Sequence, residues 1–308
     1  MKTILLIGGS GFIGANLAKA LDDKGFNVIV LDIETARFEN LIEVEHKIKI
    51  VKGNLNDSEN LSTIFENAKI DIVINLVTTL LPNSVGDEAR EEIKKNIELN
   101  EKLLNMMNSY EVKKIIYFSS GGTVYGDNGK TRNSENSKTV PINLYGWLKL
   151  SIENLIITYS KMTEVEYLII RPSNPFGKYQ NIRGKQGLIS VILGKILDDE
   201  YIEIWGKGDI IRDYIYIDDL CNGVVNLLMS NKWNEIYNIG SGKGYSVNQI
   251  IKICEDITDK KLKIIYKDAR KVDVKKNILD IKKIKTECNF IVNTSVKDGI
   301  KKTFEFLK

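Results

Sequence analysis

A glycine-rich turn near the N-terminus constrains this chain more than any other feature. Gly8, Gly11 and Gly14 recur every third residue, directly after the apolar segment 3–7 and before an apolar helical pattern that begins at Phe12. In such a setting the first glycine permits a tight turn, the second lets backbone amides approach a pyrophosphate, and the third lets helix and strand pack closely. The pattern therefore predicts a dinucleotide-binding βαβ unit at the start of the fold.

The first half of the chain alternates β-branched runs with segments of helical period. Alternation of this kind is typical of right-handed βαβ crossovers that build a parallel sheet. Strands are expected at 3–7, 27–31, 48–51, 72–76, 114–118 and 167–170. Helices are expected at 12–24, 57–67, 87–109 and 143–162. The prediction is an α/β fold with a Rossmann-type, doubly wound parallel sheet.

After residue 172 the elements become shorter and no linker separates them from the first half. Helices are expected at 188–197, 218–229, 246–257 and 295–306, and strands at 202–204, 214–217 and 262–266. We therefore expect a smaller α/β domain interleaved with the first. Residues 1–172 plus about 213–240 would form the cofactor domain, and about 173–212 plus 241–308 would form the second domain.

Composition excludes several classes of function. The 44 Lys and Arg residues against 41 Asp and Glu leave a net charge of +3, too little to predict a nucleic-acid partner. Cys221, Cys254 and Cys288 are few and widely spaced, which indicates free thiols in the cytoplasm and neither a disulfide framework nor a metal site. The longest apolar run, 72–81, is too short and too interrupted to span a membrane.

Asp32 ends the second expected strand and bears on the choice of cofactor. A carboxylate at this place can accept hydrogen bonds from the adenosine ribose hydroxyls and would repel a 2'-phosphate. Ile33 and Glu34 follow it, so no arginine stands next to it. The sequence thus favours NAD over NADP.

Tyr145 and Lys149 stand four residues apart in an expected helix, hence on one face about a turn apart. A phenol with a pKa near 10 is a poor base at neutral pH, and a neighbouring cation favours its phenolate. The pair is therefore a candidate general base with its activating cation.

Taken in order, several motifs resemble those of the extended short-chain dehydrogenases, and most closely the UDP-hexose 4-epimerases. The glycine turn comes first, followed by Ser-Ser-Gly-Gly-Thr-Val-Tyr-Gly at 119–126 and the Tyr145 and Lys149 pair. The likeness continues through Asn-Pro-Phe-Gly at 174–177, Arg-Asp-Tyr-Ile-Tyr at 212–216 and Arg-Lys-Val-Asp at 270–273. It implies a homodimer formed by the helices at 87–109 and 143–162.

The resemblance also implies site residues. The implied NAD contacts are Gly8, Gly11, Phe12, Ile13, Gly14, Asp32, Asn54, Leu55, Leu76, Val77, Asn96, Ser119, Tyr145, Lys149 and Pro172. Asn54 stands where the family usually has Asp, and Asn96 would fix the strand that presents the catalytic segment. The implied UDP-sugar contacts are Asn174, Leu188, Trp205, Arg212, Arg270, Asp273 and Asn277.

One position departs from the family pattern. The catalytic Ser or Thr of the family falls on Gly121, which has no hydroxyl. Ser120, Thr123 or a water molecule are the alternatives for the hydrogen bond to the sugar 4-oxygen. Tyr145 would then carry more of the proton transfer.

The implied reaction inverts the sugar C4 through a 4-keto intermediate, with NAD regenerated and retained. Asn277 occupies the position that gates the space beside the C2 substituent, and it is smaller than the Tyr that restricts relatives to glucose and galactose. We expect UDP-GlcNAc and UDP-GalNAc as substrates, with UDP-Glc and UDP-Gal as a further pair. A 4,6-dehydratase would need an acid pair in the segment that here reads Gly121, Gly122 and Thr123. A UDP-uronate decarboxylase and a non-catalytic NAD-binding sensor stay open as alternatives.

Overall fold

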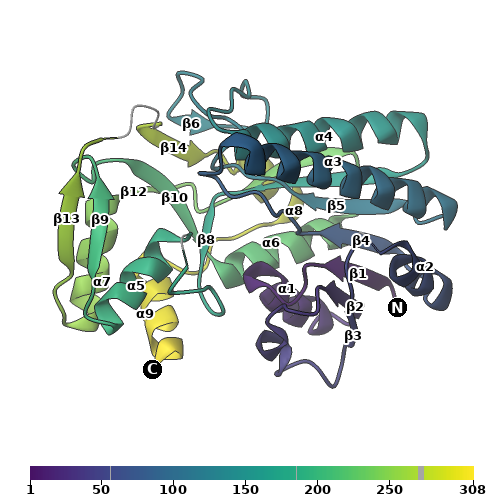
Figure 1. The fold of residues 1–308 in the computed structure, drawn as a ribbon, viewed down its shortest axis with the longest axis horizontal. Coiled ribbons are helices and arrows are strands. Elements are labelled where there is room, and N and C mark those ends of the chain that lie inside the picture. The colour runs from purple at the N-terminus through teal and green to yellow at the C-terminus, as the bar shows by residue number, and fades with distance from the viewer. Residues whose placement is uncertain (56, 185, 270–273) are drawn as a thin grey trace.

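The computed structural model describes residues 1–55, 57–184, 186–269 and 274–308. Its largest element is a seven-stranded sheet in which every neighbouring pair is parallel (Figure 1). The strand order is β11 (Glu235–Ile239), β7 (Glu166–Pro172), β5 (Lys114–Phe118), β4 (Ile72–Asn75), β1 (Thr3–Ile7), β2 (Asn27–Asp32) and β3 (Lys49–Lys52). The order reverses between β1 and β4, which is the switch point where ligands bind in such sheets.

The central strands are apolar on both faces because helices cover both. Ile4 and Leu6 of β1 join one core cluster, whereas Leu5 and Ile7 join the other, as the two-residue period of a strand requires. The first face is covered by α1 (Phe12–Asp22), α6 (Ile217–Ser230) and α8 (Lys282–Cys288). The second is covered by α2 (Ser58–Asn67), α3 (Gly86–Ser109) and α4 (Leu144–Met162). The doubly wound α/β prediction is confirmed.

A second, smaller sheet is assembled from distant parts of the chain. Its strands are β12 (Gly244–Ser246), β10 (Ile211–Tyr216), β14 (Lys276–Leu279) and β6 (Arg132–Asn133), with β8 (Asn174–Phe176) also paired to β10. A separate pair, β9 (Tyr201–Trp205) and β13 (Lys263–Lys267), lies beside α5 (Leu188–Leu197), α7 (Val247–Thr258) and α9 (Val296–Leu307), opposite α2 in Figure 1. The domain boundary expected at about residues 212 and 213 falls inside β10.

The longer elements begin and end within about two residues of the sequence-based expectation, except β10, which begins at residue 211 and not at 214. Several short ones were not expected: η1 (Phe38–Leu41), β6, β8, β11, β12, β14 and α8. Among the described residues, no helix is both long and apolar enough to cross a membrane. All three cysteines are buried and free, as expected.

Candidate active site

The glycine turn joins β1 to α1 at the switch point of the large sheet. Gly8 has a φ of +78°, which favours glycine, and the Leu76 and Val77 segment after β4 packs against it. A Cβ on Gly14 would lie 2.3 Å from the carbonyl oxygen of Gly8 and 2.5 Å from Cα of Gly9. The third glycine is therefore required for close packing of helix on strand, as the sequence predicts.

The carboxylate of Asp32 is held next to this turn at the end of β2. Its Oδ2 accepts hydrogen bonds from the backbone N of Ser10 at 3.0 Å and the hydroxyl of Ser10 at 2.6 Å. The N–H of Gly53 donates to the Asp32 carbonyl, which brings Asn54 and the buried Leu55 beside the same edge. Sequence reasoning missed Ser10; its place between two glycines of the turn was the available signal.

Tyr145 and Lys149 come together on the first two turns of α4. Lys149 is only 2% exposed; its Nζ donates to the carbonyl of Phe118 at 2.8 Å and lies 5.8 Å from the centroid of the Tyr145 ring. Burial lowers the pKa of Lys149 to about 7, against the charge of Glu153, which raises it. Burial raises the pKa of Tyr145 to about 12. At neutral pH the Tyr145 phenol is therefore protonated, and the Lys149 ammonium titrates close to this pH.

A buried ionic network lies behind the pair. The Glu153 carboxylate accepts hydrogen bonds from the Ser119 hydroxyl and from the Arg171 guanidinium, at 3.0 Å from Nε and 2.5 Å from a terminal nitrogen. Arg171 also donates to the hydroxyl of Tyr125 at 3.1 Å. The Ser119 side chain, expected to contact NAD, is therefore engaged inside the protein. Sequence reasoning missed Glu153, whose position four residues after Lys149 was the signal.

The motif at 119–126 forms a tight turn after β5. The backbone N–H groups of Thr123 and Val124 both donate to the carbonyl of Ser120, at 3.2 and 3.1 Å. Gly146 of α4 packs against Thr123, since a Cβ built there would lie 2.8 Å from its carbonyl oxygen. This contact sets the turn beside Tyr145.

The two glycines of that turn face different surroundings. A Cβ on Gly121 would lie 2.7 Å from a Leu279 methyl and 3.0 Å from the carbonyl oxygen of Arg171, so a Ser or Thr does not fit there without a shift. A Cβ on Gly122 would instead lie 3.7 Å from the Ser120 hydroxyl and 3.8 Å from the amide oxygen of Asn174. The open side of the turn is the side of Ser120 and Asn174.

Four buried hydroxyls have no hydrogen-bond partner among the described residues. They belong to Thr78, Tyr117, Thr123 and Ser173. Thr78 follows β4, Tyr117 lies in β5, Thr123 follows β5 and Ser173 follows β7, so all four lie toward the carboxyl end of three adjacent strands. Buried polar atoms are nearly always satisfied, so unpaired ones toward the same edge of the sheet fit a site whose ligand supplies the partners.

The expected UDP-sugar contacts lie in three separate parts of the chain. Asn174 donates to the carbonyl of Asp213 at 2.8 Å, Arg212 donates to the carbonyl of Val274 at 2.6 Å, and Arg212 registers with Asn277 across β10 and β14. The structure thus brings Asn174, Arg212 and Asn277 into one sheet. Leu188 begins α5, and Trp205 ends β9 with 42% of its surface exposed. The remaining two, Arg270 and Asp273, lie outside the described residues.

Asn96 of α3 is buried and holds a neighbouring loop. Its amide nitrogen donates to the hydroxyl of Thr79 and to the carbonyl of Glu92, each at 2.7 Å. These contacts fix the segment after β4, whereas the resemblance led us to expect a contact with the strand that presents the catalytic turn.

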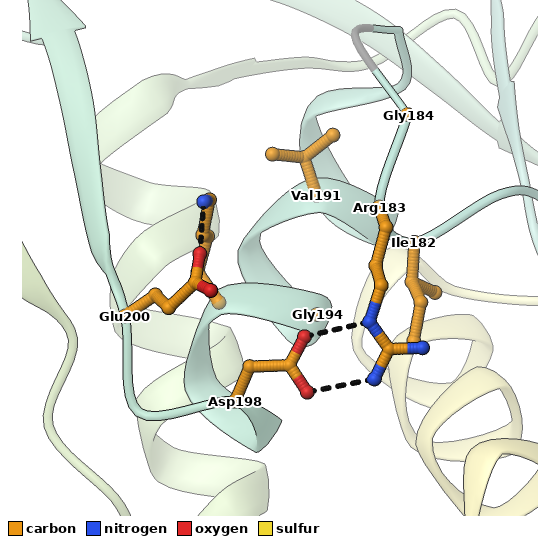
Figure 2. Close-up of a pocket in the computed structure, with 8 residues that line it drawn as sticks. Ile182, Arg183, Gly184, Val191, Gly194, Asp198 and Glu200 are labelled. Carbon is orange, nitrogen blue, oxygen red and sulfur yellow. Dashed lines mark hydrogen bonds and ion pairs between the residues drawn. The ribbon is translucent and has the colours of Figure 1, made fainter.

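A separate pocket of about 210 Å³ opens beside α5. Figure 2 shows Arg183 and Asp198 facing each other across it, joined by hydrogen bonds of 2.9 and 2.8 Å. Lys195 pairs with Glu200 at the same pocket. The charged side chains described at this pocket are thus paired with one another.

Comparison with known proteins decides the family. Residues 4–240, more than three quarters of the chain, match the NAD dependent epimerase/dehydratase family. The chain belongs to this family.

Relatives within the family carry out different reactions. A UDP-glucose 4-epimerase from Thermotoga maritima, solved with UDP-glucose, is 32% identical, with 99% of this chain and 98% of that chain covered and a TM-score of 0.92. A UDP-N-acetylglucosamine 4-epimerase from Methanobrevibacter ruminantium is 26% identical, with 99% and 98% covered and a TM-score of 0.89. A dTDP-4-dehydro-6-deoxyglucose reductase from Escherichia coli is 31% identical, with 99% and 97% covered. Family membership therefore leaves the substrate open.

Proposed function

We propose that this family member is a 4-epimerase of UDP-hexoses that retains NAD as a prosthetic group. The observation that carries the proposal is the Tyr145 and Lys149 pair on α4. Gly146, the next residue of that helix, packs against Thr123, whose hydroxyl is buried and has no partner among the described residues. A phenol, a cation and a free hydroxyl at one point are the groups that proton transfer at a sugar hydroxyl requires.

The residues present fit NAD. The backbone between Gly8 and Gly14 would hold the pyrophosphate, because it contains the amino end of α1. The glycines have no side chain that would block the approach of the phosphates. Asp32 would hold the adenosine ribose and disfavour a 2'-phosphate. When bound, NAD would supply the acceptor for the hydride from C4 and the donor that returns it.

The protein's own groups manage the proton. Tyr145 would remove the proton of the 4-hydroxyl, for which its pKa must fall well below the value of about 12 that burial gives it. The Lys149 ammonium, fixed against the Tyr145 ring, supplies a stabilising charge for the phenolate. We assign the hydrogen bond to the 4-oxygen to Thr123, because its hydroxyl is buried and unpaired, with Ser120 on the same turn as the alternative.

Anchoring through the nucleotide would leave the hexose free to turn over between the two halves of the reaction. Asn174 and Arg212, with Arg270 and Asp273, would hold the UDP portion; a guanidinium fork suits phosphate oxygens. We propose UDP-GlcNAc and UDP-GalNAc as the main substrate pair, since Asn277 is compact where a tyrosine would crowd the C2 substituent. The Methanobrevibacter relative is described as a UDP-N-acetylglucosamine 4-epimerase, which supports this choice.

We also propose that the chain acts in the cytoplasm as a homodimer. The three buried free thiols suit a reducing compartment. The helices α3 and α4 pack side by side over one face of the sheet (Figure 1). Trp147 of α4 is 47% exposed. Sedimentation of the wild type and of Trp147→Glu tests the assembly: the account expects a dimer that the variant weakens, and a monomeric wild type contradicts it.

The direct test is incubation of purified protein with UDP-GlcNAc and, separately, UDP-Glc, without added reductant, followed by anion exchange and mass detection. The proposal expects a C4 epimer of equal mass. Loss of water would indicate a dehydratase, and loss of carbon dioxide from a UDP-uronate would indicate a decarboxylase. Turnover that requires added NADH or NADPH and a 4-keto sugar would indicate a reductase such as the Escherichia coli relative. A protein that binds NAD but converts no substrate, with or without Tyr145, would be a sensor.

A further inference from the structure

Asn277 does more in this structure than leave space. Its Nδ2 donates to the carbonyls of Gly121 at 3.0 Å and Gly122 at 3.2 Å, and its Oδ1 accepts from Nδ2 of Asn133 at 3.1 Å. Only 4% of its surface is exposed. Both hydrogens of the amide are therefore committed to the backbone of the catalytic turn, the segment 120–124, and the oxygen is committed to β6.

The same strand contacts this turn at a second point. Leu279 lies two residues after Asn277 in β14, hence on the same face of the strand, and its methyl groups occupy the space into which a side chain at Gly121 would project. Because Leu279 of β14 fills this space, residue 121 has no room for a side chain and hence for a hydroxyl. The turn has no side chain at Gly121 or Gly122 that could anchor it. It is held instead by the hydrogen bonds that the carbonyls of these two residues accept from Asn277.

The orientation of the Asn277 amide is fixed by its neighbour. Asn133 presents its NH2 to Asn277, while its own Oδ1 accepts from Asn128 at 2.8 Å. Reversal of the Asn277 amide would set NH2 against NH2 at Asn133 and oxygen against the carbonyls of Gly121 and Gly122. Each hydrogen bond in the chain therefore fixes the direction of the next.

This arrangement adjoins the proposed nucleotide-binding residues. Arg212 of β10 registers with Asn277 in β14 and donates to the carbonyl of Val274, three residues before it. The strand that fixes the catalytic turn is thus paired with the strand that would hold the UDP diphosphate.

We propose that Asn277 is a positioning residue that clamps the catalytic turn, so that the Thr123 and Ser120 hydroxyls face the sugar C4. The inference rests on the proposed function and adds to it. A gate beside C2 acts on the choice between sugars, whereas a clamp on the turn acts on turnover of every sugar. The two roles therefore have different kinetic signatures.

The test uses Asn277→Asp, which keeps the shape but sets a carboxylate oxygen against two carbonyls. The clamp predicts that kcat falls by the same factor for UDP-GlcNAc and UDP-Glc, roughly 100-fold, as for misplacement of reacting groups by about an ångström. KM and the Kd for free UDP should stay within about twofold of the wild type. Asn133→Asp should give the same pattern by turning the Asn277 amide.

Asn226→Asp is the matched control, because this half-buried asparagine of α6 also donates to a backbone carbonyl, that of Asn289. It should leave kcat unchanged. Hydrogen exchange gives a readout independent of activity: backbone amides in 119–126 should exchange faster in Asn277→Asp and not in Asn226→Asp.

Several results would overturn the clamp. One is hydrogen exchange of the backbone amides in 119–126 that is as slow in Asn277→Asp as in the wild type. Another is a change only in the ratio between the two sugars, which is the signature of a gate alone. Parallel loss of UDP affinity, Tm and kcat would indicate general destabilisation. An inactive wild type would instead refute the proposed function, and the exchange measurement would still decide whether Asn277 holds the turn.

Discussion

The ammonium of Lys149 lies against the ring of Tyr145, with Nζ 5.8 Å from the ring centroid, and it donates a hydrogen bond of 2.8 Å to the carbonyl of Phe118. The cation is therefore fixed by the end of β5. Burial shifts the two groups in opposite directions, with a pKa of about 7 for Lys149 and about 12 for Tyr145. Each is held in its uncharged form more readily than in water, and a bound ligand must reverse this for proton transfer to occur.

Replacement of Tyr145 by Phe should remove the base and leave the binding site intact. We expect kcat to fall roughly 100- to 10,000-fold, as for loss of a general base. The Kd for UDP and the amount of NAD that copurifies should change little, because the ring remains. Calorimetry and acid release of the nucleotide check these values, and a variant that turns over at the wild-type rate would contradict the role of Tyr145.

The lowered pKa of Lys149 predicts a pH dependence of stability. Between the folded pKa of about 7 and the ordinary value of 10.5, the unfolded chain binds the lysine proton and the folded chain does not. The contribution of Lys149 to the free energy of unfolding of the wild type therefore rises with pH across that window. Lys149→Met lacks the effect, so its Tm relative to the wild type should be highest near pH 7 and decline toward pH 10. A difference that stays constant with pH would contradict the shift.

Thr123→Val should separate catalysis from stability. The Thr123 hydroxyl is buried and has no partner within the described part of the chain, so its loss removes no hydrogen bond and should leave Tm equal or slightly higher. The kcat should fall roughly 10- to 100-fold, the equivalent of about 1.5 to 3 kcal/mol for a hydrogen bond to a charged group. Ser120→Ala is the companion variant; a larger loss there would move the assignment to Ser120.

The glycine turn offers a matched pair of variants. In Gly14→Ala the new methyl would lie 2.3 Å from the backbone oxygen of Gly8, which cannot shift cheaply, so we expect a loss of about 1 to 3 kcal/mol in the free energy of unfolding. In Gly11→Ala the methyl would lie 3.4 Å from that oxygen. This variant should keep its Tm and lose NAD affinity, because the methyl hinders the approach of the pyrophosphate. Equal Tm values for both variants would contradict the packing argument.

Elements with strong local periodicity could be predicted from the sequence, and those defined by distant pairing could not. The glycine turn, the alternation up to β7 and helices such as α5 follow from patterns within one segment. By contrast, β6 has two residues and β8 three, and each exists because it pairs with a strand far along the chain. The edge strand β11 contains the polar Asn238, which weakens the apolar pattern of the strand. This side chain is buried, and its amide oxygen accepts a hydrogen bond from the Tyr125 hydroxyl.

The candidate site shows the same division. Tyr145, Lys149 and Asp32 are recognised by spacing to a motif, and the structure places them at the carboxyl edge of the sheet. Glu153 and the clamp by Asn277 depend on which side chains meet after folding. A local sequence pattern does not show which distant side chains come into contact. The sequence therefore predicts Asn277 only as a small residue that leaves space.

The most direct test of the account is the fate of the hydrogen at C4. UDP-GlcNAc labelled with deuterium at C4 is incubated with the purified protein in ordinary water, without added cofactor, and the product is analysed by mass spectrometry and NMR. The account predicts a C4 epimer that keeps its deuterium at C4, because the hydrogen leaves and returns within one closed site. Epimerisation with deuterium lost to the solvent, or no epimer from a protein shown to carry NAD, would contradict it.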